Sequence, residues 1–274
     1  MVRKIPKTRN VKIIFPSMIT SISMIAGFAS ILMAAENRLV EAGTLILVAI
    51  ILDGVDGKVA RITNTASEFG VQLDSLADLV SFGVAPSVLF YRFYLYGRVE
   101  HQLFFLLPVI FMLCGAIRLA RFNVTASVHG KSHFTGQPIP SAAGTLIVWI
   151  PLQNWMASSD VAFFVNLAPY LDPDKFFRYA VALCVVGSLS MISNMKFDTF
   201  NTFWFHLYPK KYMNYTVFAL FLSLLFVHFV VFMFAIAVYY WVVMFTRELM
   251  NTIRKRTHDV QRVSSEEDAE IQGG

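Results

Sequence analysis

The sequence predicts an all-α fold, a polytopic bundle of transmembrane helices, on three observations. Hydrophobic residues make up 56% of the chain and charged residues only 15%, against about 25% charged residues in soluble domains. Several uncharged runs approach or exceed the ~20 residues that a helix needs to cross a bilayer. Basic residues border these runs, as is typical of cytoplasmic helix ends. This composition excludes a disordered chain, a disulfide-stapled domain and an ordinary water-soluble enzyme.

Residues 1–12 are expected to form a basic cytoplasmic N-terminus, because they carry Lys and Arg side chains and no acid. The run 13–34 has no charged residue and no cleavage-site pattern after a short apolar core. We therefore expect a retained first span and not a removed signal peptide. No nucleic-acid partner is expected, since the basic runs are short and lie at span ends.

The second span is predicted to begin near Val40 and to reach carboxylates at membrane depth or at the membrane edge. Its uncharged part, 42–52, covers only about half a bilayer at ~1.5 Å per residue before Asp53 follows. Further spans are predicted over the apolar stretches that remain before residue 200, with an outer loop at 157–175. These spans are 71–95, 102–120, 140–156 and 176–195. The two cysteines, Cys114 and Cys184, lie in apolar runs and are expected to be buried, neither bridged nor metal-binding.

The run 217–245 is uncharged and would be about 44 Å long as one straight helix, too long for a single upright crossing. Two tight spans with a turn near His228 instead place both termini and the basic loops on one cytoplasmic side, as the positive-inside rule favours. We therefore expect eight spans, the last two of them within 201–250. Residues 251–274 are expected to form a polar cytoplasmic tail.

One segment carries most of the candidate chemistry. Asp53 and Asp56 are spaced i,i+3, and Asp74 and Asp78 are spaced i,i+4, so each pair shares one helix face. The polar stretch 62–69 suits a turn between two antiparallel helices, which would bring the four carboxylates together. Such a cluster near hydrocarbon requires compensating positive charge. Oxygen ligands favour Mg²⁺ or Mn²⁺, and two divalent metal ions form the usual clamp for attack at phosphorus.

Small and basic residues beside the acids indicate a bulky anionic ligand. Gly57 and Ala60 remove side-chain bulk next to the acids, and Arg61 can make a bidentate contact with phosphate. Either small residue alone would be more typical of a helix-packing contact. The complete set at this register favours a ligand site.

Residues 53–78 match the pattern D-x2-D-G-x2-A-R-x8-G-x3-D-x3-D at every fixed position. On this motif the chain resembles the CDP-alcohol phosphotransferases. The resemblance implies a six-helix core, here within 13–200, which is often dimeric and has an active site open to the cytoplasm. It implies that Asp53, Asp56 and Asp74 ligate two divalent metals, and that Asp78 completes the cluster and is the base for the acceptor hydroxyl. The implied contacts to the CDP donor are Gly57, Ala60, Arg61, Ser67 and Gly70.

Three further stretches, 79–86, 118–123 and 134–143, together with Ser193 and Asn194, resemble the bacterial phosphatidylserine synthase branch of this family. This branch implies CDP-diacylglycerol and L-serine as substrates, a homodimer among membrane lipids, and the bacterial cytoplasmic membrane as the location. Two positions depart from the usual pattern: Ser17 follows Pro16 where Asn is common, and Gln137 replaces a Leu.

A zwitterionic acceptor such as serine needs a cation for its carboxylate. Candidate acceptor-binding residues are Arg118, Arg121, Gln137 and Pro138. The alternative role for the two arginines is to anchor a helix end at the cytoplasmic membrane surface, as the positive-inside rule describes. The alternative role for Gln137 and Pro138 is to form a turn where the chain enters a span. Inositol, inositol phosphate, choline and glycerol phosphate remain open as acceptors. A cation or proton transporter that uses the Asp cluster is the rival of a different class, although the cluster lies on one side of its spans.

Overall fold

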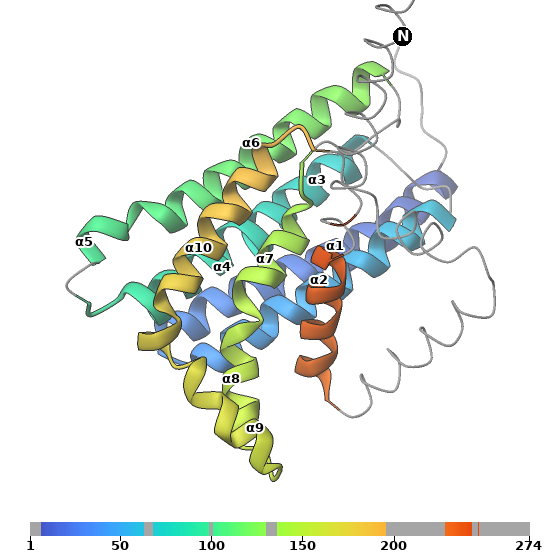
Figure 1. Cartoon of the computed structure of the whole chain (residues 1–274). Helices are drawn as coiled ribbons and strands as arrows, with labels where there is room; N and C mark the ends of the chain where they lie inside the picture. Colours follow the sequence, from blue (N-terminus) through green and yellow to red (C-terminus); the bar gives the residue numbers. More distant parts are fainter. Residues whose placement is uncertain are drawn as a thin grey trace, which may run out of the picture. The chain divides into compact units, whose positions relative to one another are not determined.

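The computed structural model describes a helical core and part of one C-terminal helix. The described ranges are 7–62, 68–98, 101–129, 136–195, 228–242 and 246. Side chains are described at these positions except at 7–17, 19, 56–62, 68, 101, 103 and 125–129. Every regular element within these ranges is helical (Figure 1). The chain divides into two compact units, Met1–Phe234 and Ala235–Gly274, and the fold and site below belong to the first.

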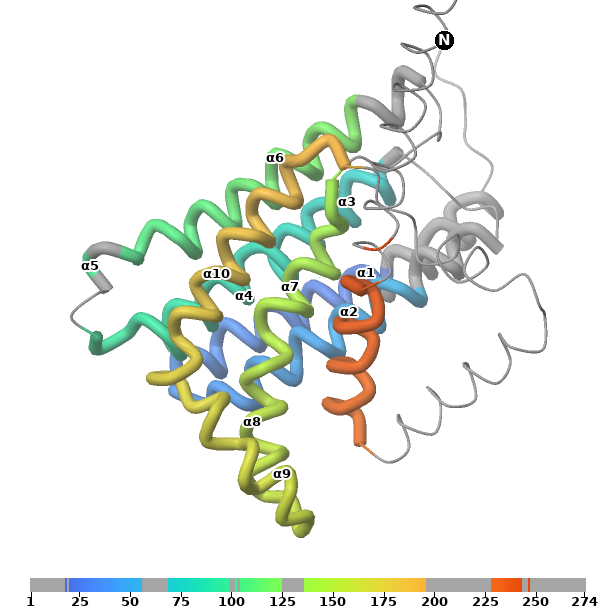
Figure 2. The backbone as a smooth tube through the Cα atoms, in the orientation of Figure 1, coloured from blue at the N-terminus to red at the C-terminus, as the bar shows by residue number. Residues whose placement is uncertain are grey.

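The first half of the core is a pair of helices followed by one long interrupted helix. Its elements are α1 (Lys7–Ala35), α2 (Leu39–Ile62), α3 (Glu68–Asp78), π-helical η1 (Leu79–Val84), α4 (Ala85–Phe90) and π-helical η2 (Tyr91–Leu95). Helix α1 packs along α2, and α3 packs on α1. Helices α2 and α3 are thus both neighbours of α1 (Figure 2).

The second half supplies the remaining core helices. Its elements are α5 (His101–Phe104), α6 (Leu106–His129), α7 (Ile139–Ile147), α8 (Trp149–Ala157), α9 (Ala162–Leu167), the 3-10 turn η3 (Ala168–Tyr170) and α10 (Pro173–Ile192). Side chains such as Ile46, Phe82, Phe90, Phe111 and Ile139 are fully buried where these helices meet. Both cysteines are buried and free, as predicted.

Three helical stretches are long and apolar enough to cross a membrane in the described part of the chain: Phe69–Leu95, Leu106–Val124 and Pro173–Ile192. They correspond to the predicted spans 71–95, 102–120 and 176–195. The chain is therefore an all-α membrane helix bundle. The described part of the C-terminal run is a helix over Phe229–Val242 that follows His228. Residues 201–227 and 247–274 lie outside the described ranges, so the last two spans and the tail stay predictions.

Two predicted spans are less regular than expected, and in each of them a proline accounts for one irregular turn. Pro86 cannot donate to the carbonyl of Phe82, and the helix widens just before it, with the Ala85 N–H donating to the Val80 carbonyl. Span 140–156 is divided at Val148, because Pro151 has no N–H for the carbonyl of Ile147. The segment 157–175, which was expected to be an outer loop, is partly helical, because it contains α9 and η3.

A close contact between α1 and η1 fixes the segment that follows Asp78. The Ser81 hydroxyl donates to the Ser23 carbonyl at 3.0 Å. A Cβ placed on Gly27 would lie 2.6 Å from the Ser81 Cα, so only glycine allows this approach. Glycine at position 27 therefore allows the turn after Asp78 to pack closely against α1.

We expect Gly27→Ala to destabilise the protein by about 1–3 kcal/mol, because the clash involves backbone that must shift. Thermal unfolding in detergent would measure this as a lower Tm. Gly54→Ala is the matched control, since a Cβ there meets nothing within 4 Å and alanine is the better helix former. An unchanged Tm for Gly27→Ala would show that α1 and η1 do not need this contact.

Candidate active site

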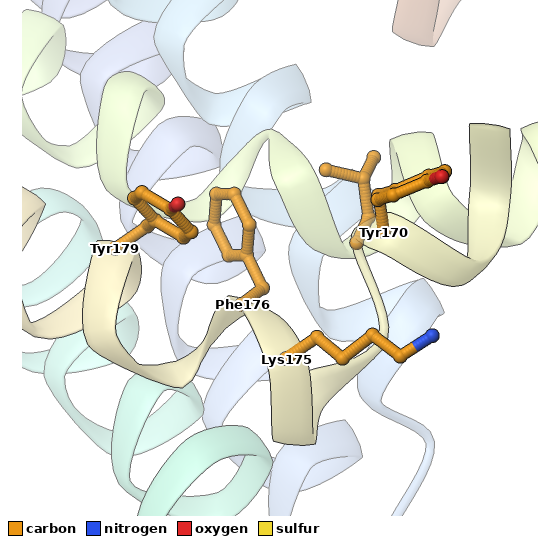
Figure 3. A pocket seen from close by; sticks show the side chains of 5 residues that line it. Tyr170, Lys175, Phe176 and Tyr179 are labelled. Atoms are coloured by element: carbon orange, nitrogen blue, oxygen red, sulfur yellow. The ribbon is translucent and has the colours of Figure 1, made fainter.

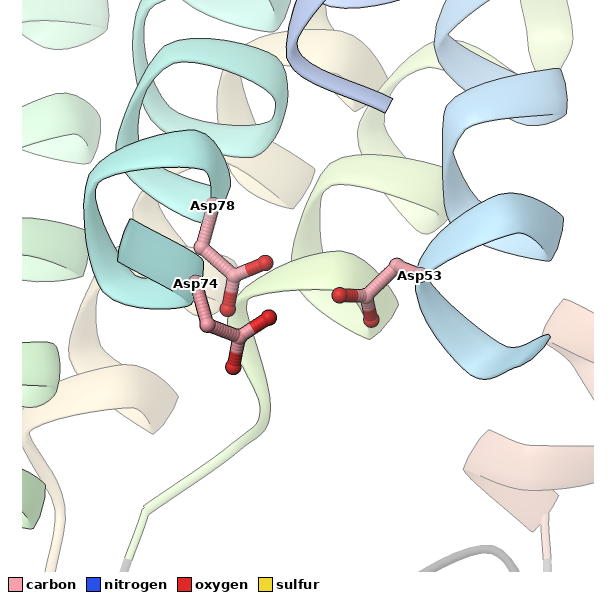
Figure 4. A group of neighbouring side chains, drawn as sticks. All are labelled: Asp53, Asp74 and Asp78. Atoms are coloured by element: carbon pink, nitrogen blue, oxygen red, sulfur yellow. The ribbon is translucent and has the colours of Figure 1, made fainter. Parts of the chain in front are cut away.

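Three of the four predicted carboxylates converge between the second half of α2 and the second half of α3. Asp53 projects from α2, and Asp74 and Asp78 project from α3 one turn apart (Figure 4). One oxygen from each of the three lies within 4.8 Å of the others. The i,i+4 spacing of Asp74 and Asp78 accounts for their shared face. The side chain of Asp56 lies outside the described residues, so its place in the cluster stays a prediction.

The members of the carboxylate cluster differ in their exposure to solvent. Asp78 is 9% exposed, while Asp53 and Asp74 are half-buried. The carboxyl groups of Asp53 and Asp78 lie within hydrogen-bonding reach of each other. Two carboxylates approach so closely only with a proton or a cation between them.

These residues fit a divalent metal. Three convergent carboxylates offer oxygen ligands only, which hard ions such as Mg²⁺ and Mn²⁺ prefer. The guanidinium of Arg118 is close enough to interact electrostatically with Asp78, but a single positive charge does not balance three carboxylates. The donor set and its charge therefore both suit a bound cation.

The predicted donor contacts lie along the chain next to the cluster. Gly57, Ala60 and Arg61 occupy the last turns of α2, and Gly70 is in the first turn of α3. The side chains of the α2 residues, and Ser67 as a whole, lie outside the described residues. Their contacts with a CDP group remain predictions.

The two predicted acceptor arginines differ in their surroundings. Arg118 is 7% exposed and interacts with Asp78. Arg121 instead donates to the end of α10: its Nη1 lies 3.1 Å from the Ile192 carbonyl and its Nη2 lies 3.2 Å from the Ser193 carbonyl. Because the last carbonyls of a helix lack partners within it, Arg121 caps α10.

Gln137 and Pro138 belong to the same structural junction. Gln137 is fully buried; its backbone N–H donates to the Ser190 carbonyl at 3.0 Å, and its side-chain oxygen accepts from the Ser190 hydroxyl. Pro138 is the residue before α7. A Cβ on the preceding residue, Gly136, would lie 2.3 Å from the Met191 carbonyl. The junction therefore joins the start of α7 to the end of α10, as the span-entry alternative predicts.

A polar link between α3 and α6 was not predicted from the sequence. Ser75, which directly follows Asp74, is hydrogen-bonded to Asn123. Ser75 stands at a variable position of the motif, so the pattern gave no reason to select it. The position of Asn123 five residues after Arg118 was visible, but only the packing of α6 beside α3 connects the two side chains.

A hollow lies at the N-terminal end of α10, opposite the end that Arg121 caps. It encloses about 450 Å³ and is lined by Tyr170, Leu171, Lys175, Phe176 and Tyr179 (Figure 3). Helix α10 has 20 residues and is therefore about 30 Å long, and its other end is the one that Arg121 caps. This hollow is thus remote from the carboxylates and has no acid among its lining residues.

The model of the CDP-alcohol phosphatidyltransferase family matches residues 13–171, which include the complete carboxylate motif and more than half of the chain. The chain belongs to the CDP-alcohol phosphatidyltransferase family. The family assignment that the motif at 53–78 suggested is confirmed. As a member of this family, the chain carries its Asp cluster where two consecutive helices meet.

Several curated relatives share this region. A CDP-diacylglycerol–serine O-phosphatidyltransferase of Helicobacter pylori is 43% identical over 143 residues, 52% of this chain and 59% of that protein. A protein of the same name from Methanocaldococcus jannaschii is 40% identical over 176 residues, 61% of this chain and 80% of that protein. An archaetidylserine synthase of Methanothermobacter thermautotrophicus is 40% identical over 138 residues, 49% of this chain and 56% of that protein. The chain thus spans a little over half the length of the first and third of these relatives.

Proposed function

We propose that this membrane protein transfers the phosphatidyl group of CDP-diacylglycerol to the hydroxyl of L-serine and releases CMP. The observation that carries the proposal is the convergence of Asp53, Asp74 and Asp78 beside the buried Arg118. The names of the relatives support serine as the acceptor. Family membership supports a CDP-linked donor.

Asp53, Asp56 and Asp74 are the proposed ligands of two divalent ions, Mg²⁺ or Mn²⁺, with Asp78 beside them. Such ions would neutralise charge on the diphosphate and on the departing CMP. Gly57 and Ala60 leave room at the end of α2 for the CDP group, and Arg61 offers a bidentate phosphate contact. Ser67 and Gly70 lie between Arg61 and the second Asp pair in the sequence, and we assign them to the same donor subsite.

Asp78 is the proposed general base. The serine hydroxyl oxygen attacks the phosphorus that bears the diacylglycerol, the bond from that phosphorus to the CMP oxygen breaks, and the hydroxyl proton moves to the Asp78 carboxylate. A carboxylate suits this task because the attack is driven mainly by charge stabilisation at the diphosphate, so a weak base is sufficient. The burial of Asp78 would keep water from competing with serine.

Arg118 is the proposed partner of the serine carboxylate. In serine only Cβ and Cα separate the hydroxyl oxygen from the carboxylate, so the base and the cation must be neighbours. Arg118 interacts with Asp78 and meets this requirement. Arg121 and Gln137 would act indirectly, since both hold the end of α10, and Pro138 sets the start of α7 beside them.

The membrane arrangement is also part of the proposal. The basic N-terminus and the basic loops favour a cytoplasmic position for both termini and for the Asp cluster. The acyl chains of the donor would then stay in the bilayer while its CDP group enters from the cytoplasm. The bacterial cytoplasmic membrane and a homodimer complete the proposal.

A CMP-release assay on purified protein tests the acceptor. We expect release from CDP-diacylglycerol with L-serine and Mn²⁺ or Mg²⁺, and a loss of at least about a hundredfold when a chelator removes the metal. Inositol, inositol phosphate, choline and glycerol 3-phosphate serve as comparison acceptors. Faster release with one of them would overturn the serine assignment and keep the family chemistry. Folded protein that releases no CMP with any acceptor would contradict the transferase proposal as a whole and favour the transporter rival.

A further inference from the structure

A hydrogen-bonded pair connects the helix of the carboxylates to the helix of Arg118. The Nδ2 of Asn123 donates to the Ser75 Oγ at 2.9 Å. The Ser75 Oγ lies 3.1 Å from the Val71 carbonyl and 3.3 Å from the Asn123 Oδ1. A hydroxyl has a single proton, and the shorter contact assigns it to Val71. Ser75 therefore accepts from α6 while it donates within α3.

The position of this pair relates it to the reacting groups. Ser75 lies between Asp74 and Asp78, and Asn123 follows Arg118 on α6 by little more than one turn. Both side chains are half-buried, where a hydrogen bond has less competition from water. A change in this contact would alter the distance from the α3 carboxylates to Arg118.

Among the described residues, α3 has few direct contacts with α6. It packs on α1, whereas α6 packs on η1, the turns after Asp78. The outer face of α3 is open, with Phe69 68% and Leu76 58% exposed. Because η1 continues α3, its packing on α6 holds the end of α3 at Asp78. The Ser75–Asn123 hydrogen bond adds a direct polar contact to α6 one turn earlier, beside Asp74.

We propose that Ser75 and Asn123 are positioning residues for phosphatidyl transfer, holding Asp74 and Asp78 in register with Arg118. This inference rests on the proposed function. Neither residue needs to touch a substrate. Because a small misplacement of reacting groups can lower a rate by about a hundredfold, the loss of the hydrogen bond is expected mainly in kcat. A misplaced Asp74 would also weaken metal binding.

The test compares Ser75→Thr with Ser75→Val. These side chains have nearly the same shape and are both β-branched, but only threonine keeps the hydroxyl. We expect Ser75→Thr to stay within about twofold of the wild type, and Ser75→Val to lose about tenfold in kcat and in Mn²⁺ affinity. The KM for CDP-diacylglycerol should change less than about twofold in both. Ser158→Ala removes a hydroxyl that donates to the Asn154 carbonyl at the end of α8 and is expected to change nothing.

A double-mutant cycle with Asn123 tests whether the loss of the hydrogen bond causes the difference between the Thr and Val variants. In an Asn123→Ala background the Thr and Val variants should become equal, because the donor to Ser75 is gone. Equal kcat and Mn²⁺ affinity for the Thr and Val variants in the wild-type background would overturn the inference. So would a Thr–Val difference that persists without Asn123.

The Mn²⁺ titration separates this inference from the proposed function, since it requires no acceptor. If the wild type used another alcohol, the serine assignment would fail, and the Thr–Val comparison would be made with that alcohol. Thermal unfolding of each variant measures its stability. If Ser75 and Asn123 were needed only for folding, the loss of activity would be accompanied by a lower Tm.

Discussion

Asp78→Asn is expected to lower kcat at least about a thousandfold, in the range that a general base contributes. Asparagine has nearly the same size and keeps an oxygen for the cluster, but it cannot accept the hydroxyl proton. CMP release with serine and CDP-diacylglycerol at saturating Mn²⁺ would measure the effect. Because Asp78 is buried beside other carboxylates, the removal of one negative charge should not unfold the protein.

Asp160→Asn is the control for this substitution, since Asp160 is an exposed acid between α8 and α9 and outside the cluster. It is expected to retain wild-type kcat. A variant Asp78→Asn that bound metal and kept more than about a tenth of the wild-type kcat would show that another group, or water, removes the proton.

Asp53→Asn is expected to weaken Mn²⁺ binding by about a hundredfold and to abolish transfer at ordinary metal concentrations. Asp53 is the described member of the cluster that α2 contributes, so its loss would remove the ligand through which a bound metal would join α2 to α3. Titration of purified protein with Mn²⁺, followed by calorimetry or by the electron paramagnetic resonance signal of free Mn²⁺, would measure the change.

A second readout does not depend on catalysis. Metal that binds only the folded state raises its stability by RT ln(1 + [L]/Kd), so Mn²⁺ should raise the Tm of the wild type and of Asp160→Asn. The same addition should leave the Tm of Asp53→Asn nearly unchanged. An equal Tm rise in Asp53→Asn and the wild type would mean that the bound metal is elsewhere.

The candidate site was predictable from the sequence where its geometry is local. The i,i+4 spacing of Asp74 and Asp78 fixes their shared face on any α-helix. The polar stretch 62–69 predicted a turn between two antiparallel helices, and the structure brings Asp53 of α2 beside Asp74 and Asp78 of α3. The apolar runs likewise predicted the positions of the main spans, because a bilayer sets their length.

The remaining features depend on contacts between distant parts of the chain. Arg118 and Arg121 look equivalent in the sequence, yet α10 ends beside Arg121 and occupies its guanidinium. The partners of Gln137 and Ser75 lie on other helices, and no spacing rule specifies them. The widening before Pro86 was in principle readable from proline's missing donor, but whether a helix ends, kinks or widens there depends on packing such as that at Gly27.

The most direct test of the account follows the oxygen of the acceptor. Purified protein would be incubated with CDP-diacylglycerol, Mn²⁺ and L-serine labelled with ¹⁸O in its hydroxyl group. Mass spectrometry would then measure the masses of the lipid and nucleotide products. If the serine hydroxyl attacks phosphorus, phosphatidylserine will carry the label and CMP will not, and neither product will form in the presence of a chelator. Unlabelled phosphatidylserine, or phosphatidic acid as the main lipid product, would contradict attack by the serine hydroxyl at phosphorus.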